Sequence, residues 1–110
     1  MKVEEKGHTI TVKDTQGDLA SFLLKLEQES QTFSKHNLII DLSSHKGLIA
    51  KDVLSFTDFY KKHKKEKKSF VVVASDFDFN SNTKKIMVVP SVLEAHDIIE
   101  MEEIERDLGF

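Results

Sequence analysis

The amino-acid sequence predicts an α/β domain with a mixed, largely parallel sheet of four to five strands and three main helices. Two segments, Leu38–Leu42 and Phe70–Ala74, are continuously apolar, which is typical of strands buried on both faces. The segment between them, residues 47–68, has the apolar spacing of a helix. Strands that alternate with helices are typical of a parallel sheet covered by helices.

The first part of the chain predicts two strands and a helix. Residues 2–5 and 8–12 alternate in polarity around Gly7, which indicates two short strands joined by a tight turn. Thr15 and Asp18 have the spacing of a capping box, so a helix is expected to begin after Thr15. The apolar face of this helix consists of Leu19, Phe22, Leu23 and Leu26.

The later elements follow from the same kind of pattern. Residues 75–85 are polar without a helical period, residues 86–89 form a short apolar strand, and Ser91 with Glu94 has capping-box spacing. We therefore expect a loop, a strand and a last helix. In the second helix the expected apolar stripe is Ile49, Val53, Phe56 and Tyr60. In the last helix it is Ala95, Ile98, Met101, Ile104 and Leu108.

Size and composition favour a cytoplasmic protein of one domain, residues 1–110. A chain of 110 residues is long enough for one hydrophobic core and too short for two. It contains no cysteine, which excludes disulfides and thiolate metal ligands. No apolar run has the length of a membrane span or the flanks of a signal peptide. We therefore expect no membrane partner.

The charges are separated along the chain although the net charge is only −3. An acidic block covers residues 94–107, and a basic block precedes the second buried strand. The basic block is expected to be a solvated helix end or, as the alternative, a protein-docking patch. Nucleic acid is a poor candidate for this block, because no aromatic side chains alternate with the lysines. The lysines are Lys61, Lys62, Lys64, Lys65, Lys67 and Lys68.

Three short motifs resemble the STAS domain, the family of the bacterial anti-sigma factor antagonists and of the cytoplasmic tails of sulfate transporters. They are Leu38–Ser43, Gly47-Leu48 and Ser91–Ala95, the last of which is similar to the start of the family's closing helix. The resemblance implies a regulatory protein-interaction module without enzymatic activity, acting on an unknown protein partner as a monomer or weak homodimer. The partner-binding residues that it implies are Ser43, Ser44, His45, Lys46, Gly47 and Asp76.

The chain departs from the antagonist pattern at one position. Those proteins carry a phosphorylated serine before the Gly-Leu pair, whereas Lys46 stands there in this chain. The usual phosphoserine switch is therefore not expected. Ser43 and Ser44 are the nearest hydroxyl groups that could take its place.

A second resemblance is to small stand-alone proteins that carry the label ribonuclease Z by association with that enzyme. The enzyme itself uses a His-x-His-x-Asp-His metal motif, which this sequence lacks. An accessory role beside an RNA-processing enzyme such as ribonuclease Z is thus one alternative, and a nuclease activity is not expected. The histidines are scattered along the chain as His8, His36, His45, His63 and His96.

The other alternative is a small-ligand or cation binder, or an enzyme, that uses the acidic loops after the parallel strands. Ligands of open α/β sheets bind at this edge, and oxygen ligands suit magnesium. The candidates are Asp41, Asp76 and Asp78. Strand-end aspartates more often bond their own loops, and sequence neighbours such as Ser44 and His45 rarely form a catalytic pair. We therefore expect no catalytic residue, no metal and no cofactor.

Overall fold

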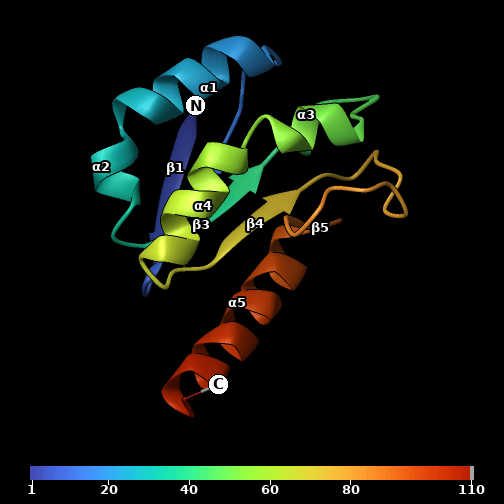
Figure 1. Cartoon of the computed structure of the whole chain (residues 1–110). Coiled ribbons are helices and arrows are strands. Elements are labelled where there is room, and N and C mark those ends of the chain that lie inside the picture. Colours follow the sequence, from blue (N-terminus) through green and yellow to red (C-terminus); the bar gives the residue numbers. More distant parts are fainter. Residues whose placement is uncertain (110) are drawn as a thin grey trace.

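The computed structural model describes residues 1–109 and contains one five-stranded sheet (Figure 1). The strands lie in the sheet in the order of the sequence. β1 is antiparallel to β2, and the remaining neighbours are parallel. This confirms the mixed, largely parallel sheet. The strands are β1 (Lys2–Lys6), β2 (Thr9–Lys13), β3 (Asn37–Asp41), β4 (Phe70–Val73) and β5 (Met87–Val89).

Helices cover both faces of the sheet, so the fold has three layers. The first four helices gather on one face, and the last helix lies alone on the other (Figure 1). Three of these segments are the main helices that the sequence predicts: α1, the α3–α4 pair and α5. The helices are α1 (Leu19–Gln28), α2 (Ser30–Phe33), α3 (Ala50–Leu54), α4 (Thr57–Lys65) and α5 (Val92–Asp107).

The central strand β3 shows why the sheet needs two helical layers. Leu38 and Ile40 belong to the core beneath α1 and α4, whereas Ile39 belongs to a second core beneath α5. All three side chains are fully buried. Burial on alternating faces explains the continuous apolar run, and each such side chain contributes roughly 1.5–3 kcal/mol.

The N-terminal hairpin forms one edge of the sheet. Gly7 makes its turn with a φ of 60°, a left-handed conformation that glycine adopts without a Cβ penalty. All five residues of β1 are exposed, and only one edge of this strand is paired. The hairpin agrees with the predicted pair of strands.

The start of the first helix differs from the capping box that the sequence predicts. Asp18, and not Thr15, is the N-cap residue of α1. Its carboxylate accepts hydrogen bonds from the backbone N–H of Ser21 at 3.3 Å and from the Ser21 hydroxyl at 2.8 Å. An N-cap aspartate satisfies a donor that the first turn would otherwise leave free.

Replacing Asp18 with alanine is expected to lower the melting temperature at neutral pH and to have less effect in acid. The Ser21 hydroxyl, followed by its backbone N–H, lowers the pKa of Asp18 below the usual 3.8. A pKa that is lower in the folded state stabilises above the unfolded value, and this stabilisation disappears as the pH falls through the folded value. Thermal melts of both proteins from neutral pH to below 3.8 test this. An unchanged difference across that range would contradict the role of the carboxylate.

The single helix expected over residues 47–68 is two helices, α3 and α4. The hydroxyls of Ser55 and Thr57 donate to the carbonyl oxygens of Asp52 and Leu54, both at 2.5 Å. Such bonds back to the preceding turn compete with the helical ladder and bend the chain. The expected stripe is also wrong at its start, because Ile49 precedes α3 and is exposed.

Most of the apolar stripe predicted for the last helix faces away from the sheet. Ala95 and Ile99 face the sheet, whereas Met101, Ile104 and Leu108 are exposed. The small Ala95 side chain allows the helix to approach the strands closely. The next two turns of α5 place Glu102 and Arg106 on this same inward side. Both side chains reach polar groups at the beginning of β3 and β4. Those polar partners are Ser69 and Asn37.

Candidate functional site

Three parallel strands end at one edge of the sheet, and the loops that follow them make up the candidate functional site. Asp14 follows β2, residues 42–49 follow β3, and residues 74–79 follow β4. This is the edge where open α/β sheets bind their ligands. We refer to residues 43–49 and 75–79 together as the loop surface.

Asp14 holds the loop surface in place through hydrogen bonds to two of its residues. Its Oδ2 atom lies 2.6 Å from Nε2 of His45, and the two side chains are only 4 % and 9 % exposed. The Asp14 carbonyl oxygen accepts the hydroxyl of Ser44 at 2.8 Å. Its Oδ1 atom accepts the backbone N–H of Gln16 at 3.0 Å. Asp14 therefore holds two of the predicted partner-binding residues, Ser44 and His45, in place.

Asp14 is not among the residues predicted from the sequence, because the sequence pattern of β2 does not identify its parallel partner strand. The parallel pairing of β2 with β3 brings Lys13 beside Asp41, so Asp14 reaches the same edge as the loop after β3. An available signal was the aspartate that directly follows an apolar strand. Asp41, the last residue of β3, lies one position earlier relative to its strand and is level with Lys13.

Gly47 joins the loop after β3 to the loop after β4. Its backbone N–H donates to Oδ2 of Asp76 at 3.0 Å, and its φ of 67° is left-handed. A residue with a Cβ is strained in this conformation. Next to it, Leu48 forms a parallel β-bridge with Phe77. The structure thus brings together all six predicted partner-binding residues: Ser43, Ser44, His45, Lys46, Gly47 and Asp76.

The structure does not form a serine–histidine pair from Ser44 and His45. The Ser44 hydroxyl donates to the carbonyl oxygen of Asp14, and the His45 ring nitrogen faces the Asp14 carboxylate. A serine nucleophile needs its own hydroxyl hydrogen-bonded to the base. The geometry therefore gives Ser44 and His45 structural roles in this loop.

The three aspartates considered as cation ligands each bond the loop in which they lie or a neighbouring loop. Asp41 accepts the N–H of Ser43, and Asp78 accepts the N–H of Asn80, both at 3.0 Å. Asp76 accepts the N–H of Gly47. Across residues 1–109, no three His, Asp or Glu side chains gather in an arrangement that could hold a metal ion.

Apolar side chains lie beside these bonded polar groups. Ile49 is 58 % exposed and Phe79 is 47 % exposed. The Phe79 ring packs edge-on against Phe77, with 5.6 Å between the centroids, and Phe77 in turn packs against the core. The loop surface therefore presents exposed apolar groups on a supported backbone.

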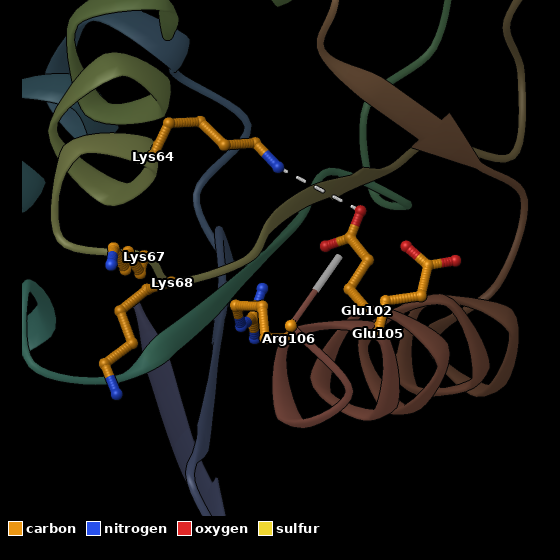
Figure 2. A pocket seen from close by; sticks show the side chains of 7 residues that line it. Lys64, Lys67, Lys68, Glu102, Glu105 and Arg106 are labelled. Carbon is orange, nitrogen blue, oxygen red and sulfur yellow. Dashed lines mark ion pairs between the residues drawn. The ribbon is translucent and has the colours of Figure 1, made fainter.

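The basic block is divided around the end of α4 instead of forming one patch. Lys61 and Lys62 border a hollow beside α1, and Lys62 and Lys65 border another beside α2. The remaining three, Lys64, Lys67 and Lys68, line a groove of about 480 Å³ beside α5, and Lys64 extends toward that helix (Figure 2). The helical period of 3.6 residues spreads the first four lysines around α4, and Lys67 and Lys68 follow the end of that helix.

The groove between α4 and α5 has mixed charge. Figure 2 shows Lys64 extending toward Glu102, with 4.0 Å between Nζ and Oε2. Glu102 also accepts the Ser69 hydroxyl at 2.5 Å, and Arg106 donates to the same hydroxyl oxygen at 3.1 Å. Burial raises the pKa of nearby Tyr60 above 10.0, and Glu102 adds to this effect. Acidic groups on α5 therefore offset part of the basic block.

Comparison with known proteins adds no family assignment. No protein-family model matches the chain, and a search of curated proteins finds no related sequence. Within the part of the chain that the structure describes, none of the helices combines the length and apolarity that crossing a membrane requires.

Proposed function

We propose that this chain is a STAS-like protein-interaction module that regulates a protein partner without catalysing a reaction. The observation that supports this best is that the loop surface combines hydrogen-bonded polar groups with exposed apolar side chains. Ser44, His45 and Gly47 form hydrogen bonds inside the fold, while Ile49 and Phe79 are exposed beside them. A preordered surface with apolar anchors suits a protein interface, because little order is lost on binding.

The place of this surface in the fold also supports the proposal. In the family that the sequence resembles, the loop after the first buried strand and the start of the next helix meet the partner. The corresponding parts of this chain are the loop after β3 and the residues that lead into α3.

The proposal includes no phosphoserine switch. Lys46 precedes Gly47, where the family's antagonists have the modified serine. Ser44 donates its hydroxyl hydrogen to Asp14, and a phosphate there would remove this bond and add charge beside a carboxylate. Modification of Ser44 would therefore oppose the observed loop.

A double variant of the two exposed apolar residues tests the loop surface. Ile49→Asp with Phe79→Asp is expected to weaken partner binding at least about tenfold, because apolar anchors dominate interface energies. The experiment is affinity capture from the native cell followed by mass spectrometry and a binding titration with each captured protein. Leu24→Asp is the matched control, since Leu24 is 61 % exposed on α1 and far from the loop surface in sequence.

The result expected is a partner retained by the wild-type chain and by the control but lost from the double variant. Retention of every captured protein by the double variant would contradict the proposal. Lys65→Glu with Lys67→Glu tests the basic block in the same way. Loss of binding in this variant alone, with strong weakening by salt, would move the partner site to the basic block.

A further inference from the structure

The outward side of α5 carries exposed apolar side chains that nothing within residues 1–109 covers. Four residues at helical spacing form one stripe, which we call the α5 stripe. The four residues are Leu93, Met101, Ile104 and Leu108, and they are exposed by 73, 59, 59 and 65 %, respectively. The inward face of the same helix has its own apolar contacts through Ala95 and Ile99, so the α5 stripe is surplus to the core.

Acidic side chains border the α5 stripe along its whole length. By the helical period, Glu94 and Glu105 lie on one side of it, Glu100 and Asp107 lie on the other, and Asp97 lies within it. All five are exposed. The basic residue of this helix, Arg106, is turned inward and donates to Ser69 and Asn37.

A groove of about 350 Å³ extends beside the stripe, between α5 and the β1–β2 hairpin. Leu93 and Ile99 contribute its apolar lining, and three acids line it: Asp97, Glu100 and Glu103. Across the groove, Nδ1 of His8 lies 3.5 Å from Oε2 of Glu103. The α5 side of the groove therefore continues the acid-bordered apolar surface, although it also includes His96, whereas Lys6 and His8 line the side formed by the hairpin.

The charge around the stripe decides between its possible occupants. Pairing of α5 with α5 of a second copy would bring acidic borders together, and like charges across an interface are costly. The chain's own basic block offers charge, but its exposed lysines on α4 have no apolar side chains among them to cover the stripe. The complement is a segment with apolar residues on one face and Lys or Arg at its borders.

We propose that the α5 stripe and its groove dock a basic amphipathic helix of a partner protein. The apolar face of that helix covers Met101 and Ile104, and its cations pair with the bordering acids. This is the helix-in-groove mode of recognition, and electrostatic complementarity requires that the partner helix be positively charged. The site is separate from the loop surface and does not depend on the function proposed for it.

Two designed peptides of identical leucine and lysine composition test the proposal by fluorescence anisotropy. One places the leucines on one helical face, and the other has a scrambled order. The amphipathic peptide is expected to bind at least about tenfold more tightly than the scrambled one. Met101→Ser with Ile104→Ser is expected to remove this preference. Asp97→Lys with Glu100→Lys is expected to weaken binding of both peptides, because it removes the attraction.

Leu24→Ser on α1 is the matched control, and circular dichroism checks that each variant is folded. Equal binding of the two peptides would overturn the proposal, since charge alone would then explain it. Full affinity in the Met101→Ser, Ile104→Ser variant would also overturn it. So would a wild-type dimer in sedimentation that this variant converts to monomer, because the occupant would then be a second copy. The Ile49→Asp, Phe79→Asp variant should bind the peptides normally, which keeps the two surfaces distinguishable.

Discussion

Replacing Asp14 with alanine is expected to destabilise the fold by about 3 kcal/mol, because it removes a buried carboxylate that accepts hydrogen bonds. The Asp14 side chain is 4 % exposed and lies 2.6 Å from His45. It also accepts the N–H of Gln16. For a domain of this size, where total stability is about 5–15 kcal/mol, the loss is a large fraction. The loop surface should lose its order at the same time.

Urea unfolding measures this loss, and Asp14→Asn is the matched control. In asparagine the carbonyl oxygen can take the place of Oδ1 and accept from Gln16, and the NH2 group can take the place of Oδ2 and donate to Nε2 of His45, so the cost should be clearly smaller. Hydrogen bonds at the loop surface can be followed separately by amide exchange of Gly47. If Asp14→Ala and the wild type have equal unfolding free energies, then the Asp14–His45 contact does not stabilise the fold.

Replacing Phe56 with alanine is expected to cost about 4 kcal/mol through the cavity that it leaves. The ring is fully buried at the bend between α3 and α4. Its centroid lies 6.3, 6.4 and 6.5 Å from those of Phe22, Phe59 and Phe70, respectively. The residue therefore joins α1, α4 and β4 in one aromatic cluster.

Phe79→Ala is the matched control for this substitution, because it removes the same group from a half-exposed position in the loop after β4. Denaturant melts should show a small change for Phe79→Ala and a large one for Phe56→Ala. A cost below about 1 kcal/mol for Phe56→Ala would contradict the central place of this ring in the core.

Much of the fold follows from local patterns in the sequence. The apolar run around Ile39 requires burial on both faces, and only a sheet between two helical layers supplies this. Ser91 accepts the N–H of Glu94, as the spacing of the two residues predicts. These features involve near neighbours or a strong hydrophobic pattern, so they do not require knowledge of the tertiary pairing.

The features that the sequence did not reveal depend on long-range contacts. Helix α5 has apolar residues on two sides, and periodicity alone cannot choose between Ile99 and Ile104 as the buried one. The buried side is the one on which Ile99 packs against strand residues far away in sequence. On the same side, Glu102 and Arg106 bond to Ser69, which is also distant in sequence. Asp14 was missed for a similar reason, because its site exists only once β2 pairs with β3.

The exposed edge strand β1 has a consequence for aggregation. If two copies joined these edges in the full antiparallel register, Lys2 would face Lys6 and Glu4 would face Glu4. In a parallel, in-register stack, each charged residue would face the same residue of the neighbouring chain. Like charges directly opposite one another destabilise strand pairing, and charged edges keep sheets from extending into fibrils. The sequence of β1 thus protects this edge of the sheet from pairing with other copies, while the other edge of the strand remains paired with β2.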